Sequence, residues 1–289
     1  MPGALYELVR APAALTVPGD TLAGAVAAGV PPRPAVAGLA AASVCLYWAG
    51  MALNDYADRT VDAYERSHRP VPSGRASAGT ALAVAVCGTT AGLGLAALSG
   101  GPRSLAVAVP LAATVWAYDL KLKQGPWGPV AMAAARGLDV LLGATAGGGS
   151  MARALVPAST MAAHTAVVTR LSRDEVHGAK PALPRATLAA TAVVCATVTV
   201  PPRGRDTRSA LALRAGLAGV YAYRFGRPQA TALRQPTAER IRSAVGAGIH
   251  SMVPLQAALV ARAGAPLPAL LLSGALPLAR RLSRRVSPT

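Results

Sequence analysis

The dominant pattern along the chain is a series of long apolar runs separated by short segments that carry Arg, Pro or Gly. About 20 apolar residues are needed to cross roughly 30 Å of hydrocarbon, and helices satisfy their own backbone hydrogen bonds there. The pattern therefore predicts an all-α integral membrane protein with nine to ten transmembrane helices. The number is given as a range because the first and last runs are short and interrupted by Pro. The expected spans are 13–30, 35–53, 77–98, 104–119, 129–147, 152–170, 185–201, 208–224, 241–261 and 265–281.

Composition agrees with this class. The chain is 53% hydrophobic and 14% charged, whereas soluble domains carry about a quarter charged residues. No Ser/Gly linker or shift in composition divides the chain, so we expect a single domain over residues 1–289. The three cysteines fall within apolar runs at no metal-ligand spacing, which favours small buried hydrophobes. The N-terminus lacks the ordered parts of a signal peptide, so none is expected to be cleaved.

The net charge of +17 has two interpretations. A basic domain would indicate nucleic-acid binding, but here the basic residues separate apolar runs, so no nucleic-acid partner is expected. Twenty Lys and Arg residues fall on one set of alternate loops and seven on the other. The positive-inside rule then places both termini in the cytoplasm of a multi-pass cell-membrane protein. Most acidic residues lie on the same side, so we expect a cytoplasmic active face.

The strongest candidate for chemistry follows the second apolar run, in the sequence Asn54-Asp55-Tyr56-Ala57-Asp58-Arg59-Thr60-Val61-Asp62. If the helix continues, Asp55, Asp58 and Asp62 share one face, where like charges repel. A hard cation such as Mg²⁺ reverses that cost and completes its shell with substrate phosphate. We therefore expect a Mg²⁺–diphosphate site at the membrane surface, the alternative being a solvated loop with a helix N-cap. Basic residues follow at Arg66, Arg69 and Arg75.

This run resembles the first aspartate-rich motif, Asn-Asp-x-x-Asp-x-x-x-Asp, of the UbiA superfamily of intramembrane prenyltransferases. The next segment, Arg69-Pro70-Val71-Pro72-Ser73-Gly74-Arg75, looks like the Arg-Pro-rich continuation of that motif. Tyr118-Asp119-Leu120-Lys121-Leu122-Lys123 resembles a Tyr-Ser-x-x-Leu-Lys segment, and Arg136-Gly137-Leu138-Asp139 a further signature. The likeness runs in order from about residue 8 to 180.

The resemblance implies a helical bundle around a central cavity open to the membrane. There, a Mg²⁺-bound prenyl diphosphate ionises, and its allylic carbon passes to a small-molecule or lipid acceptor. Mg²⁺ and basic side chains neutralise the departing diphosphate, and an apolar tunnel keeps water away. The implied catalytic and metal-binding residues are Asp55, Asp58 and Asp62, with Asp174 and Glu175 as further metal ligands. The implied diphosphate-binding residues are Asn54, Arg69, Arg75, Lys121, Lys123 and Arg136.

The second aspartate motif departs from the family pattern. Where the family has Asp-x-x-x-Asp, this chain has Ser172-Arg173-Asp174-Glu175-Val176-His177. Adjacent Asp174 and Glu175 point about 100° apart on a helix, and the position four after Asp174 is Gly178. A second Mg²⁺ would be poorly supplied. We therefore expect a divergent member of the family, with a purely structural loop as the alternative.

Other polar groups within apolar runs need a partner or a role, because charge at membrane depth is costly. Arg136 and Asp139 either neutralise each other at spacing i, i+3, or Arg136 reaches the diphosphate. Asp20 either faces the cavity and contacts the acceptor, or caps the helix interrupted at Pro18-Gly19, which we favour. His164 and His250 are expected to be hydrogen-bonded interior residues.

Two rival functions remain. The CDP-alcohol phosphotransferases also use Mg²⁺-binding aspartates, but they resemble Asp-Gly-x-x-Ala-Arg followed by spaced Gly and Asp residues, and that run is absent here. A transport-type or non-catalytic isoprenoid-binding protein of the same fold is favoured by the incomplete second motif.

Overall fold

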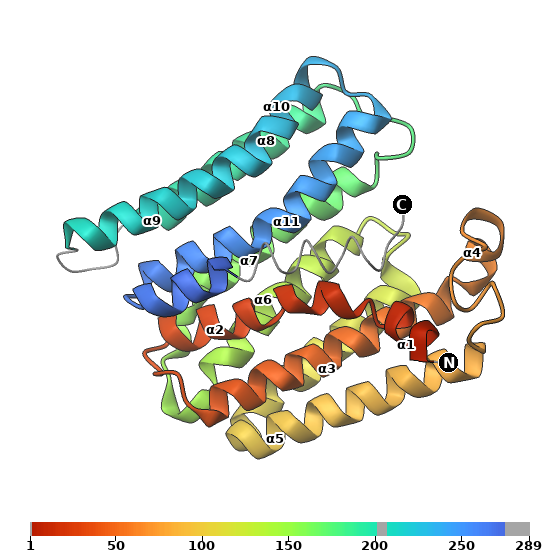
Figure 1. Cartoon of the computed structure of the whole chain (residues 1–289), viewed down its shortest axis with the longest axis horizontal. Coiled ribbons are helices and arrows are strands. Elements are labelled where there is room, and N and C mark those ends of the chain that lie inside the picture. The colour runs from red at the N-terminus through yellow and green to blue at the C-terminus, as the bar shows by residue number, and fades with distance from the viewer. Residues whose placement is uncertain (1, 201–206, 275–289) are drawn as a thin grey trace.

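The computed structural model describes residues 2–200 and 207–274, which form helices joined by short loops, with no strand in these two ranges (Figure 1). The predicted all-α class is confirmed. The helices are α1 (Pro2–Leu8), η1 (Ala11–Thr16), α2 (Pro18–Ala27), α3 (Pro34–Ala57), α4 (Arg59–Glu65), α5 (Ala78–Ala117), η2 (Tyr118–Leu122), α6 (Gly128–Ala144), η3 (Ala146–Gly148), α7 (Met151–Ser172), α8 (Ala182–Thr199), α9 (Arg208–Tyr221), η4 (Ala222–Gly226), α10 (Arg227–Arg234) and α11 (Ala238–Arg262).

Helix α5 is a hairpin of two helical arms. Gly101 takes φ 66° and ψ −154° inside it, a conformation that Gly tolerates and that Pro102 follows without needing an N–H donor. The arms lie side by side, as a hydrogen bond of 3.0 Å from Trp116 Nε1 in one arm to Thr89 Oγ1 in the other shows. The turn at Gly101 thus separates the predicted spans 77–98 and 104–119.

Among the described residues, four helical segments are long and apolar enough to cross a membrane: Pro34–Ala57, Ala78–Leu122, Ala182–Thr199 and Ala238–Arg262. The second is the α5 hairpin continued through η2. The predicted first span is divided, because Pro18 begins α2 after the short η1. The predicted eighth span, 208–224, runs further than expected, through η4 into α10. The predicted last span, 265–281, extends beyond the described residues.

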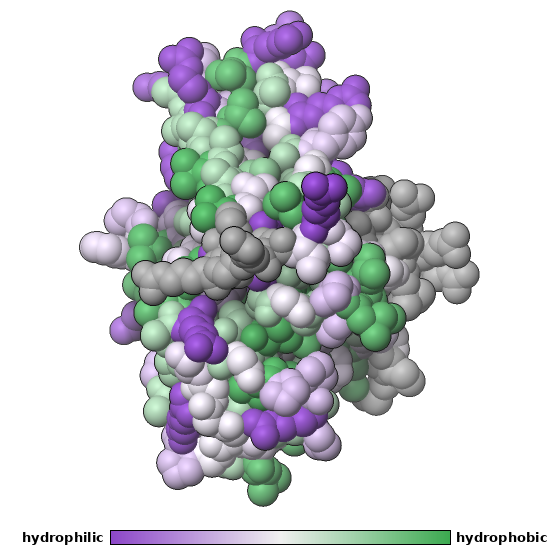
Figure 2. All heavy atoms as spheres, turned by 90° about the vertical axis from the view of Figure 1, so that its left-hand side faces the viewer, coloured by the Kyte–Doolittle hydropathy of each residue, from purple (hydrophilic) through white to green (hydrophobic). Residues whose placement is uncertain are grey.

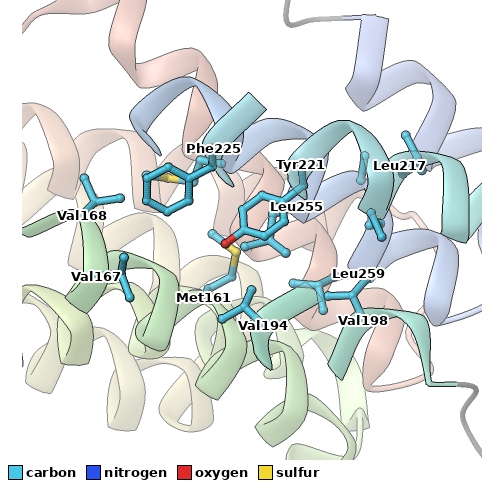
Figure 3. Close-up of a cluster of buried hydrophobic side chains, with 14 of the residues drawn as sticks. Met161, Val167, Val168, Val194, Val198, Leu217, Tyr221, Phe225, Leu255 and Leu259 are labelled. Atoms are coloured by element: carbon cyan, nitrogen blue, oxygen red, sulfur yellow. The ribbon is translucent and has the colours of Figure 1, made fainter. Parts of the chain in front are cut away.

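Large apolar side chains are gathered in the half of the bundle formed by α7, α8, α9, η4 and α11. Figure 3 shows Tyr221 close to Met161, Val194 and Leu255, with Phe225 to one side of them, and all five are buried. The other half, around α2, α3, α5 and α6, is packed mainly with Ala, Val and Leu. Small residues allow the helices to approach closely. A Cβ on Gly24 of α2 would overlap the carbonyl oxygen of Val140 on α6.

The loops meet in two groups at opposite ends of the bundle. At one end, on the left of Figure 1, the α2–α3 loop meets the segment between α6 and α7. Arg33 Nη2 donates to the carbonyl oxygens of Ala146 and Gly147 at 3.0 and 2.8 Å, and Ser150 N donates to Ala28 O. Figure 2 views this end, where hydrophilic groups are scattered among apolar ones. The right-hand end carries α1 and α4, and with them the acidic motif.

We predict that Gly24→Ala destabilises the bundle, because the new methyl group must push α2 away from α6. Overpacking of this kind costs roughly 1–3 kcal/mol. Thermal unfolding in detergent measures the effect. Gly94→Ala in α5 is the matched control, because a Cβ there meets nothing within 4 Å. Equal melting temperatures for the two variants would contradict the close α2–α6 packing.

Candidate functional site

The acidic motif lies where α3 ends. The single continuous helix considered for this run is wrong: α3 stops at Ala57, Asp58 takes φ −89° and ψ 1°, and α4 begins at Arg59. Despite this break, Asp55 and Asp62 turn toward the same arginine. Their side chains are only 4% and 1% exposed, whereas that of Asp58 is 18% exposed.

Arg69 is the cation that joins the two buried carboxylates. Its Nη1 lies 2.6 Å from Asp62 Oδ2 and 3.6 Å from Asp55 Oδ1. Asp62 is also paired with Arg66 at 3.5 Å, one helical turn on. Asp55 has a second partner in Arg10, whose Nη2 lies 3.4 Å from Oδ1. Two carboxylates therefore face three guanidinium groups.

The third aspartate is held by the segment that follows α5. Lys123 Nζ lies 2.6 Å from Asp58 Oδ1, and Asn54 Nδ2 donates to Asp119 Oδ1 at 3.2 Å. The chain passes here through η2, which has the wide turn of a π-helix, a feature frequent at functional sites. Lys121 on the same turn is exposed. Of the residues in this segment, the structure therefore brings Lys123 and Asp119 to the motif.

Arg75 lies at the edge of the site and is held by α1. Its Nη2 is 2.8 Å from Glu7 Oε2 and donates to the carbonyl oxygen of His68 at 2.6 Å. The hydrogen bond to Glu7 raises the pKa of Arg75 above its ordinary value. Arg75 is thus a fixed positive charge beside the motif.

The segment of the second motif contacts the loop that follows η2 through the side chain of Arg173. Arg173 Nη2 donates to the carbonyl oxygens of Gln124 and Gly125 at 3.1 and 2.8 Å, next to Lys123. Asp174 is paired with Arg170 at 2.6 Å, and the backbone carbonyl of Glu175 accepts from Arg242 at 3.4 Å.

Gly178 occupies the place of the missing second acid. Its φ is +80°, and a Cβ there would lie 2.7 Å from the carbonyl oxygen of Pro236. The local backbone therefore excludes an aspartate at this position.

The carboxylates suit a hard cation chemically, since Mg²⁺ prefers carboxylate oxygens. Within residues 2–200 and 207–274, no three His, Cys, Asp or Glu side chains are grouped closely enough to hold an ion. The aspartates are paired with Arg and Lys instead. Asp62 Oδ1 is buried and lies 3.5 Å from Arg66 Nη1, but it accepts no hydrogen bond, so acceptor capacity remains. Asp55, Asp58 and Asp62 stay predicted Mg²⁺ ligands, as do Asp174 and Glu175.

A separate polar cluster lies among α2, α3, α6 and α11. Arg136 Nη1 is 2.7 Å from Asp20 Oδ2, and Gln256 Nε2 donates to Asp20 Oδ1 at 2.9 Å. Asp139 instead accepts a hydrogen bond from Ser43 Oγ. The favoured helix cap for Asp20 is therefore wrong, because its fully buried carboxylate is bound by Arg136 and Gln256. The predicted role of Arg136 toward diphosphate must compete with this ion pair.

His164 and His250 are both hydrogen-bonded, as expected. His164 is fully buried, with Nδ1 3.1 Å from the Tyr221 hydroxyl and Nε2 3.2 Å from Gly248 O. His250 Nδ1 lies 2.7 Å from Gly246 O in its own helix.

The sequence did not identify two groups at the site. Arg10 counted only as a topology signal, although it contacts Asp55 across 45 positions of the chain. Asp119 belongs to the segment that resembles the family, and its position two and four residues before Lys121 and Lys123 is the signal that could have found it.

The long apolar helices define an integral membrane protein, and one end of the bundle carries paired acidic and basic side chains. Comparison with known proteins gives the family: the UbiA prenyltransferase family matches residues 17–223. The chain belongs to this family. The resemblance inferred from the motifs is confirmed.

Relatives of known activity match part of the chain. A digeranylgeranylglyceryl phosphate synthase from Natronomonas pharaonis is 34% identical over 154 residues, 53% of this chain and 55% of that protein. The bacteriochlorophyll synthase 33 kDa chain from Rhodobacter capsulatus is 32% identical over 136 residues, 44% of each. The chain spans about half the length of these curated relatives.

Solved structures share the fold over nearly the whole chain. A structure described for digeranylgeranylglyceryl phosphate synthase in membranes aligns with a TM-score of 0.67 at 17% identity, covering 91% of this chain and 99% of that one. A UbiA homologue from Archaeoglobus fulgidus, bound to GPP and Mg²⁺, aligns with a TM-score of 0.56 at 16% identity, covering 92% and 99%.

We predict that Asp20→Ala destabilises the protein, because it leaves Arg136 buried without its counter-ion. Loss of one partner of a buried pair costs about 3–5 kcal/mol, which should lower the melting temperature in detergent by roughly 5 °C or more. Glu239→Ala, in an exposed position at the start of α11, is the control. An Asp20→Ala protein that melts like wild type would show that the ion pair contributes little.

Proposed function

We propose that this membrane prenyltransferase transfers a prenyl group from a prenyl diphosphate to a small-molecule or lipid acceptor, with Mg²⁺ at the end of α3. The observation that carries the proposal is the pairing of Asp55 and Asp62 with Arg69, and of Asp58 with Lys123, at the end of α3. A prenyl diphosphate is a strong anion on an apolar chain. The paired acidic and basic side chains at one end of the bundle suit the diphosphate, and the apolar helices suit the prenyl chain.

Each side chain has a proposed role that follows from its chemistry. Asp55, Asp58 and Asp62 would hold Mg²⁺, and Asn54 would supply an amide oxygen or orient a neighbour. When bound, Mg²⁺ neutralises charge on the leaving diphosphate. Arg69 would bind two phosphate oxygens with its planar fork, and Lys123 would supply a point charge. Arg75, Lys121 and Arg136 complete the proposed diphosphate-binding set. Their fixed charges favour departure of the diphosphate more than binding of the intact substrate.

The remaining parts of the reaction depend on apolar surroundings. Loss of diphosphate leaves positive charge on the allylic carbon, which water would otherwise capture. Ala, Val and Leu side chains of α2, α3, α5 and α6 would line the path of the isoprenoid and exclude water. The relatives' names indicate prenylated products as different as a glyceryl phosphate lipid and bacteriochlorophyll. The acceptor here is accordingly proposed only as a small molecule or lipid.

The excess of Lys and Arg on one set of loops supports a cytoplasmic position for the site and both termini. The contacts Lys123–Asp58 and Arg173–Gln124 join loops that this rule assigns to one side. Prenyl diphosphates and Mg²⁺ would then reach the site from the cytoplasm.

We predict that Asp55→Ala and Asp58→Ala each abolish Mg²⁺-dependent release of diphosphate, because each removes a carboxylate of the proposed metal site. Membranes containing each variant are supplied with C10, C15 and C20 prenyl diphosphates and assayed for released diphosphate. Glu65→Ala, an exposed acid of α4, should behave like wild type. Turnover retained in both aspartate variants would overturn the proposed site.

We predict that Asp174→Ala lowers diphosphate release more than Glu175→Ala does. Asp174 keeps the position of the family's first acid in the second motif. Its carboxylate is held by Arg170 only through an exposed pair, which is worth little and can be exchanged for a metal. The same membrane assay ranks the two. A reversed ranking would assign the second ligand to Glu175.

The backbone conformation of Gly178 supports one alternative function. Because its backbone excludes an aspartate, the second metal site is short of a ligand, and the protein would then bind prenyl diphosphates without turnover. Binding of a labelled prenyl diphosphate to the purified protein, with no diphosphate released in any acceptor mixture, would support this transport-type role. Release of diphosphate would exclude it.

A further inference from the structure

The N-terminal segment contacts the candidate site, although it lies outside the family's aspartate motifs in the sequence. Leu8 is fully buried against Ala52, Leu53, Ala81 and Ala85 of α3 and α5. Glu7 is paired with Arg75 at 2.8 Å. Burial of Leu8 fixes the end of α1, which lies at the same end of the bundle as α4 (Figure 1).

Arg10 makes that turn in an unusual conformation. Its φ is 46° and its ψ 50°, and it is the one non-glycine residue with positive φ in the described part of the chain. A residue with a Cβ is disfavoured there, so it persists only where the surroundings impose it. Glycine would adopt this backbone freely. The turn directs the guanidinium to Asp55 Oδ1, 3.4 Å away.

The contact with Asp55 does not saturate Arg10. The carboxylate already has Arg69 at 3.6 Å, so one negative charge is shared between two cations. The Arg10 side chain is 40% exposed, and a guanidinium has five N–H donors. Positive charge in excess of the local carboxylates, with free donors, suits an anion that arrives later.

We propose that Arg10 is a substrate-binding residue that contacts a phosphate oxygen of the diphosphate, in addition to its contact with Asp55. This inference rests on the proposed function. Arg10, positioned by α1, extends the anion-binding set to a segment 44 residues before the aspartate motif begins. The burial of Leu8 against α3 and α5 holds α1 in place, and the exposed Glu7–Arg75 pair adds a second contact.

The test measures binding of inorganic pyrophosphate with Mg²⁺ to the purified full chain in detergent, by calorimetry. Arg10→Gly removes the side chain but keeps the backbone conformation, and Arg10→Lys keeps the charge without the planar fork. We expect about tenfold or greater weakening for Arg10→Gly, the size of one charge-assisted hydrogen bond, and an intermediate loss for Arg10→Lys. Melting temperatures should stay near wild type for both.

The matched control is Arg59→Gln. Arg59 begins α4, and its guanidinium donates to Tyr56 O at 2.8 Å and lies over the Tyr56 ring. It should bind pyrophosphate like wild type. If wild type binds and Arg10→Gly binds equally or more tightly, Arg10 only neutralises Asp55 and the inference is wrong, while the proposed function stands. If wild type binds no pyrophosphate with Mg²⁺, the proposed function fails, and the inference fails with it.

Discussion

The whole candidate site depends on the neutralisation of two buried carboxylates by one arginine. Asp55 and Asp62 are almost completely buried, and a buried carboxylate without a counter-charge is strongly unfavourable. Arg69 reaches both, so the end of α3, helix α4 and the segment leading to Arg69 are held in one arrangement. Lys123 does the same for Asp58 from the end of η2. The charges therefore also determine how the loops close over the bundle.

This pairing has a consequence for substrate binding. The basic groups that would bind diphosphate are the same groups that neutralise the aspartates. The acidic and the basic side chains are therefore paired with each other before any ligand binds. A cation bound by the aspartates would release Arg69 and Lys123, and the released side chains would then bind the anion. Metal and diphosphate should therefore favour each other's binding, because each supplies the counter-charge that the other displaces. An exchange of partners costs less than creating unpaired charges near a membrane.

Most of the fold was predictable from the sequence, because apolar runs and turn residues act locally. The runs located most of the helices, and the Gly-Gly-Pro turn at 100–102 was visible as a gap between two spans. The motif was found for the same reason, since its aspartates are close in sequence. The pairs Arg10–Asp55 and Arg136–Asp20 join residues that are far apart and carry no periodic signal. The end of α3 at Asp58 was likewise hidden, because helical spacing continues through it.

The second motif shows how the same charges limit the chemistry. At the first motif, three aspartates are matched by Arg69, Arg66, Arg10 and Lys123. At the second, Asp174 has only Arg170, and Gly178 packs its backbone against Pro236 O where an acid would stand. Arg173 nevertheless ties this loop to the segment that carries Lys123. The two loops are thus kept together while the acidic ligands are concentrated on one of them. A metal–diphosphate complex in this protein would have to be held mainly from the α3 side.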